Sequence, residues 1–306
     1  MNNYKLFNKK ISYVFGFACI TFIMLDQILP LSNNQNLATY LSFFLVSTIG
    51  IYHGAFDINK VDKISNYFNL KFFNFISIYI LILVSVVTFW LLMPVFTLSL
   101  FLFISIHHFG ADDYSYFNVY PNLLISITRG ALIITLPLIL NFYETVSILK
   151  ILNFMNNTEY LTFLNSNYII FAILLTANIT LSFIYIRNYL NRIIFNTDMI
   201  LLVIINYTLE PILAFTLYFC FLHSLRNISK PIFNRSKLVF MQRKKVIFIS
   251  IITFMLFLFS FIFSTNFLNT FSALSTSIFI GLASLTFPHI VTEIVFNKVS
   301  QKQRII

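Results

Sequence analysis

The chain has 306 residues, of which 58% are hydrophobic and 10% are charged, and its formal net charge is +10 at pH 7. A water-soluble domain of this length does not carry so large an apolar fraction, so the composition excludes a soluble globular protein and indicates an integral membrane protein. The basic residues lie in short blocks between apolar runs. This pattern argues against a nucleic-acid partner and indicates loops that face anionic membrane lipid.

Apolar runs recur along the whole chain with no long polar stretch between them, which predicts one membrane domain, residues 1–306, made only of helices. The first run follows Lys5, Lys9 and Lys10 and has no convincing signal-peptide cleavage site, so we expect it to be retained as a helix. The predicted spans, each close to the ~20 residues that a bilayer requires, are 11–31, 37–57, 73–95, 96–111, 122–141, 167–186, 194–225, 246–265 and 272–297.

The basic blocks predict the orientation of these spans. Both flanks of 194–225 are basic, so a single crossing there would violate the positive-inside rule. Two helices folded back around Glu210–Pro211 satisfy the rule, and a kink at Pro211 in one tilted span is the alternative. We therefore expect an all-α, polytopic bundle of about 8–10 transmembrane helices, ten with the hairpin, whose N- and C-termini are both cytoplasmic.

The five histidines fall on helices that run in the same predicted direction, and all lie near the cytoplasmic ends of those helices. Ionisable residues at membrane depth are rare and usually functional, so imidazoles at one level predict a metal or polar site. Cys19 and Cys220 lie inside apolar runs and offer no cysteine-rich site. The histidines are His53, His107, His108, His223 and His289.

A polar residue follows four positions after each of four histidines, on the same helix face. A metal-bound imidazole usually donates its other N–H to a carboxylate or carbonyl, and such a neighbour is one way to supply it. The alternative is that these residues mark where the helices meet water. They are Asp57 after His53, Asp112 after His108, Asn227 after His223 and Glu293 after His289.

Other residues support convergence of the helices. Gly50, Gly54 and Gly110 lie close in sequence to His53 or His108, where the absence of a side chain allows close helix packing. Arg129 is expected either near the histidine layer or extended to the lipid headgroups. Imidazoles without thiolates suit iron, copper or zinc. Apolar walls around such a site indicate a lipid-soluble hydrocarbon substrate and, with a redox metal, oxygen chemistry.

Four motifs in order, "GIYHGAFDI", "HHFGADDY", "FCFLHSLRN" and "FPHI", resemble the Brp/Blh family of bacterial carotene dioxygenases over residues of about 50 to 295. The resemblance implies a multi-pass enzyme of the bacterial inner membrane. Such an enzyme uses Fe²⁺ and O₂ to cleave the central 15,15′ double bond of β-carotene into two retinal molecules. It also implies a functional link to a rhodopsin.

The resemblance also implies the metal ligands. His53, His108 and His223 match the motifs, but Asn227 stands where the family is expected to have a histidine. Three outcomes are open: Asn227 is a weaker ligand, His289 or His107 replaces it, or the activity is lost or altered. We rank His289 first and expect Asp57, Asp112 (or Asp113) and Glu293 to be hydrogen-bond partners of the ligands. No residue is expected to act as an acid or base.

Competing interpretations belong to other classes. A two-iron desaturase or hydroxylase needs more histidines than the five in this chain. A transporter or proton pathway would use His53, His108, Arg129 and Glu210 as a relay, because intramembrane ionisable groups also mark ion paths. A haem-binding anchor is a third interpretation, because histidines on facing helices ligate haem.

Overall fold

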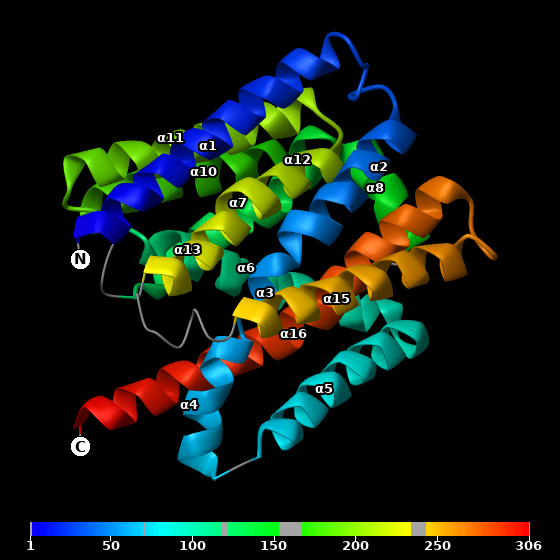
Figure 1. Ribbon diagram of the computed structural model, residues 1–306. Coiled ribbons are helices and arrows are strands. Elements are labelled where there is room, and N and C mark those ends of the chain that lie inside the picture. Colours follow the sequence, from blue (N-terminus) through cyan, green and yellow to red (C-terminus); the bar gives the residue numbers. More distant parts are fainter. Residues whose placement is uncertain (1, 70, 118–120, 153–166, 234–242, 306) are drawn as a thin grey trace.

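The fold was determined as a computed structural model, which describes residues 2–69, 71–117, 121–152, 167–233 and 243–305 (Figure 1). These residues form helices joined by short turns, with no strand among them. Seven of the described helices are long and apolar enough to cross a membrane. The all-helical, multi-pass architecture expected from the composition is therefore confirmed.

Each predicted span contains a helix. The elements are α1 (Asn2–Asp26), α2 (Gln35–Leu45), the π-helical turn η1 (Val46–Gly50), α3 (Tyr52–Ala55), α4 (Ile58–Phe68), α5 (Phe72–Leu92), α6 (Pro94–Ser115), α7 (Leu123–Leu140), α8 (Phe142–Ile151), α10 (Asn167–Tyr185), α11 (Tyr189–Thr208), α12 (Pro211–Leu217), the π-helical turn η2 (Tyr218–Ser224), α13 (Leu225–Phe233), α15 (Arg243–Ser264) and α16 (Thr270–Ile305).

The stretch 194–225 is divided as the hairpin predicts. Helix α11 ends at Thr208, Leu209 is extended, and α12 begins at Pro211, where a proline fits the first helical turn. The side-chain amide of Asn141 donates to the carbonyls of Asn206 and Leu209 and so satisfies the end of α11. The alternative of one kinked span is wrong. The two chain termini lie at the same end of the bundle (Figure 1).

Two helices and one break differ from the prediction. The amphipathic helix α4 follows the span 37–57 and buries Ile58, Val61 and Ile64, while Lys63 on the same helix is exposed. Because only one side of α4 is apolar, it is not visible as an apolar run. Helix α8 is short and was also not predicted. The span 37–57 is divided into α2, η1 and α3 rather than forming one helix.

Glycines bring α6 and α7 into close contact. A Cβ atom at Gly110 would lie 1.8 Å from the Ser126 carbonyl oxygen, and one at Gly130 would lie 1.7 Å from the Ile106 carbonyl oxygen. A side chain at either position would force the helices apart, as expected for small residues at a membrane helix interface. At Gly54 a Cβ would meet nothing within 4 Å, so close packing does not explain that glycine.

A network of charges is buried where α1, α6, α7, α11 and α13 meet. Arg129 Nε donates to Asp113 at 3.0 Å, and Arg226 bridges Asp113 at 3.2 Å and Asp198 at 2.5 Å. Both arginines are 0% exposed. Extension of Arg129 to the headgroups is therefore wrong, and its charge is neutralised inside the protein. The network fixes the rotation of α6 and α13, which carry the candidate site.

A histidine and aspartate cluster beside an apolar cavity

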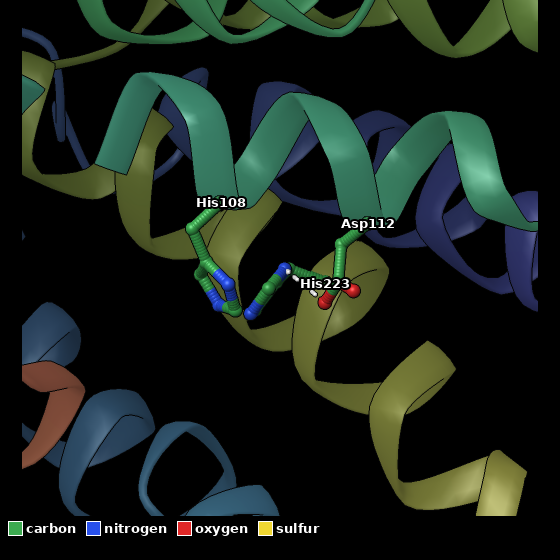
Figure 2. A group of neighbouring side chains, drawn as sticks. All are labelled: His108, Asp112 and His223. Atoms are coloured by element: carbon green, nitrogen blue, oxygen red, sulfur yellow. Dashed lines mark ion pairs between the residues drawn. The ribbon is translucent and has the colours of Figure 1, made fainter. Parts of the chain in front are cut away.

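Helix α6 and the turn η2 bring two histidines and a carboxylate together. His108 and Asp112 are one turn apart on α6, and His223 lies in η2 (Figure 2). One potential ligand atom from each of the three residues lies within 4.8 Å of the other two, and all three residues are buried. This arrangement gathers nitrogen and oxygen donors around one point, as a metal ion requires.

A third imidazole adjoins this cluster. The ring of His108 lies 5.2 Å from that of His223 and 5.5 Å from that of His289, measured between centroids, so His108 contacts both. His289 comes from α16 and is 4% exposed. His107 is exposed beside the buried His108, so its proposed replacement of the missing histidine does not fit the structure.

The side chain of His53 lies outside the residues whose side chains are described, although its backbone belongs to α3. Its role as a ligand stays a prediction from the motif resemblance.

The polar residues four positions after the histidines bind mainly across helices. Asp57 Oδ2 lies 2.8 Å from Nδ1 of His289, and Asp112 Oδ2 lies 3.7 Å from Nδ1 of His223. Glu293 forms an ion pair with Lys60 at 2.9 Å. Asp57 and Asp112 thus contact histidines of other helices. The expected contact within one helix is confirmed for Asn227, whose Nδ2 lies 3.3 Å from Nε2 of His223.

The carboxylate of Asp57 joins α4 to α16. It accepts from Lys60 Nζ at 2.9 Å in addition to its contact with His289. Asp57 is 3% exposed, Asp112 8% and Asn227 8%, so these residues do not mark where helices meet water.

An apolar cavity of about 260 Å³ opens beside the histidines. Helices α5, α15 and α16 and the segment from η1 to α4 form its walls, and His289 and Asp57 lie at its polar end. The contributing side chains from the lipid-facing helices are mostly aliphatic or aromatic: Phe75, Ile76, Tyr79, Ile80, Leu83, Ile249, Ile252, Thr253 and Leu256.

Sequence reasoning missed two contributors to this region. Lys60, a basic residue directly after the predicted span 37–57, was not singled out, yet it links Asp57 and Glu293. Its position three residues after Asp57 was the available signal. Tyr116 was not singled out, yet its hydroxyl donates to Asn227 Oδ1 at 3.2 Å. Nothing in its local sequence identifies that contact, because it joins α6 to α13.

Comparisons with known proteins identify the family. A protein from the uncultured marine bacterium 66A03, "Beta-carotene 15,15'-dioxygenase", is 28% identical over 287 residues, which cover 88% of this chain and 98% of that protein. No solved structure matches the chain. The family model for "Beta-carotene 15,15'-dioxygenase" matches residues 44–296, which include every histidine, the cavity and the buried charge network. The chain therefore belongs to the β-carotene 15,15′-dioxygenase family.

Proposed function

We propose that this protein cleaves the central 15,15′ double bond of β-carotene with O₂ and releases two retinal molecules, using Fe²⁺ bound at the histidines. The observation that carries the proposal is the apolar cavity that ends at His289, whose ring packs on His108 of the histidine and aspartate cluster. A hydrocarbon in that cavity would reach a set of metal-binding side chains. Family membership supplies the substrate class.

The donor set suits a non-haem iron. His108 and His223 offer imidazole nitrogens, Asp112 offers carboxylate oxygens, and no cysteine lies among them. Imidazole and carboxylate ligands with open positions are typical of Fe²⁺ oxygenases. Donors at ~2.1 Å from one ion are at most ~4.2 Å apart, so side chains within 4.8 Å of one another need only small shifts. We propose His108 and His223 as ligands, with His53 and His289 as the further candidates.

The bound iron would supply the activation of O₂ that the side chains themselves cannot provide. The cavity walls hold the polyene and exclude water from the reacting bond. Asp57 contacts Nδ1 of His289 and holds a proton there, which leaves Nε2 as the atom available to the site. In the overall reaction the C15–C15′ bond breaks and each carbon takes one oxygen atom of O₂, so no residue has to donate or accept a proton permanently.

The neighbouring histidines of α6 provide a direct test. His108→Ala removes an imidazole from the cluster, whereas His107→Ala removes an exposed one. In bacteria that make β-carotene, we expect the wild-type protein and His107→Ala to convert the pigment to retinal, measured by chromatography of extracts. We expect His108→Ala to form at least ~100-fold less retinal, because loss of a ligand costs more than the ~10- to 100-fold loss typical of a ligand's hydrogen-bond partner.

The proposal fails if folded wild-type protein with about one equivalent of iron leaves β-carotene unchanged. A protein that purifies without iron would instead favour the transporter or proton pathway. The structure does not favour that alternative: Glu210 lies about 20 Å from His223 along one continuous helix, and Arg129 is held by Asp113.

A further inference from the structure

We infer that Asp112 is itself a ligand of the metal, so that His108, Asp112 and His223 form a group of two imidazoles and one carboxylate, and that Asn227 holds this carboxylate in place. This inference rests on the metal site of the proposed function and names its oxygen ligand. The sequence had suggested only that Asp112 contacts a ligand.

The position of Asp112 fits a ligand. It lies on the same face of α6 as His108, one turn further along, and faces His223 of η2 (Figure 2). One potential ligand atom of Asp112 lies within 4.8 Å of one such atom of each of the two histidines. Among the described residues, His289 does not belong to this group. Asp112 therefore belongs to the compact cluster, whereas His289 lies at its edge and is held by Asp57.

The contacts of Asn227 show what its side chain does. A carboxylate accepts hydrogen bonds and does not donate them, so the atom of Asn227 that lies 2.6 Å from Asp112 Oδ2 is its NH₂ group. The other end, Oδ1, accepts from the Tyr116 hydroxyl at 3.2 Å. The NH₂ group of Asn227 thus donates to Asp112 and also lies 3.3 Å from His223, while its Oδ1 accepts from Tyr116. It positions the carboxylate rather than replacing a histidine at the metal.

Charge supports the same assignment. Two neutral imidazoles leave the double charge of a metal ion uncompensated, whereas a carboxylate ligand removes half of it inside a low-dielectric site. A carboxylate oxygen that accepts one hydrogen bond retains lone pairs for a metal. Two histidines and one carboxylate with open positions form the facial group of non-haem Fe²⁺ oxygenases.

Asp113, the next residue on α6, fixes the orientation of Asp112. Asp113 is tied to Arg129 of α7 and to Arg226 of α13, all of them buried. Arg226 immediately precedes Asn227, so α6 and α13 are joined by two adjacent contacts, Asp113 with Arg226 and Asp112 with Asn227. Together these contacts fix the rotation of both helices at the site.

Binding of Co²⁺ to the purified, metal-free full chain tests the inference without measuring cleavage. Co²⁺ accepts the same ligands as Fe²⁺, and its visible spectrum reports their identity. We expect Asp112→Asn to weaken Co²⁺ binding more than ~100-fold, beyond the ~10- to 100-fold effect of losing a hydrogen-bond partner. We expect Asp112→Glu to bind Co²⁺ with an altered spectrum, and Asn227→Ala to lose ~10- to 100-fold in affinity. Glu144→Gln, a carboxylate-to-amide change on α8, should bind like the wild type.

The outcomes separate this inference from the proposed function. If Asp112→Asn keeps the wild-type spectrum and loses less than ~100-fold in affinity, Asp112 is not a ligand, while the metal site itself stands. If Asp112→Asn does not fold, an unchanged Co²⁺ spectrum in Asp112→Glu overturns the inference equally. If the wild type binds no more Co²⁺ than His108→Ala, the metal site of the proposed function is refuted as well.

Discussion

Two fully buried arginines are neutralised by two buried carboxylates. Arg129 and Arg226 share Asp113, and Arg226 also pairs with Asp198 and donates to the Ser12 hydroxyl at 2.9 Å. Two positive and two negative charges balance, so the network as a whole is neutral. Removing one member of a buried ion pair leaves a charge without compensation, which typically costs 3–5 kcal/mol.

Asp113→Asn should therefore destabilise the protein by about 3–5 kcal/mol, because it leaves two arginines with one remaining carboxylate, Asp198. Unfolding in mixed micelles with increasing denaturing detergent would measure the change. Asp26→Asn is the matched control. Asp26 accepts two hydrogen bonds from Ser32 and is only partly buried, so its loss should cost about 1 kcal/mol. Equal losses in both variants would contradict the role given to the network.

Residue type and helical spacing indicated which polar residues lie near the candidate site, but not which of them are in contact. Helical spacing places Asp57 on the face of His53 and Asp112 on that of His108, which the sequence alone reveals. Asp57 and Asp112 also contact His289 and His223, and these contacts depend on how separate helices pack, which spacing within one helix does not reveal. The ion pair of Lys60 with Glu293 was missed for the same reason, whereas its contact with Asp57 follows from their spacing.

At the scale of elements, the contact between α6 and α7 sets the position of His108. Gly110 lies two residues after that histidine and directly against the backbone of Ser126. Gly110→Ala should destabilise the protein by about 1–3 kcal/mol, the usual cost of an overpacked interior, and should lower metal affinity by displacing α6. Thermal unfolding and metal content measured on the same sample would show both effects.

Gly54→Ala is the control for that experiment. A Cβ there meets nothing within 4 Å, and alanine favours a helix over glycine by up to about 1 kcal/mol. We expect unchanged or slightly raised stability. The prediction for Gly110 is contradicted if its alanine variant is as stable as the Gly54 variant.

The distribution of basic residues predicted the helical hairpin in 194–225, which the length of that apolar run alone could not. The basic flanks of 194–225 required a reversal, and Pro211 begins the second helix of the hairpin. The breaks in η1 and η2 had no such signal: Gly50 and His223 lie in π-helical turns that no local composition marks. These turns, frequent at functional sites, re-aim side chains within otherwise continuous helices.

At the scale of the whole molecule, two of the helices that wall the cavity, α5 and α15, are the least buried of the candidate membrane spans. Only 11% of the apolar window of α5 is buried, and the same holds for α15, yet both contribute side chains to the cavity. Their outer sides are exposed and apolar, as expected for helices in lipid. A hydrocarbon dissolved in the bilayer therefore needs to pass only these two helices to reach His289. The sequence could not reveal this, because both helices are hydrophobic on all sides.

Two leucines of α5 test that route. Leu83 lines the cavity, whereas Leu81 is 66% exposed on the same helix. Leu83→Trp adds a bulky ring to a space of about 260 Å³ and should lower retinal formation from β-carotene at least ~10-fold, equivalent to about 1.4 kcal/mol. Leu81→Trp adds the same ring to the lipid-facing surface and should not change it. Retinal formed per bound iron measures both variants, because this ratio separates a blocked cavity from a loss of metal. Equal rates for the two would mean that β-carotene reaches the histidines by another path, because a tryptophan cannot share this cavity with a rigid polyene.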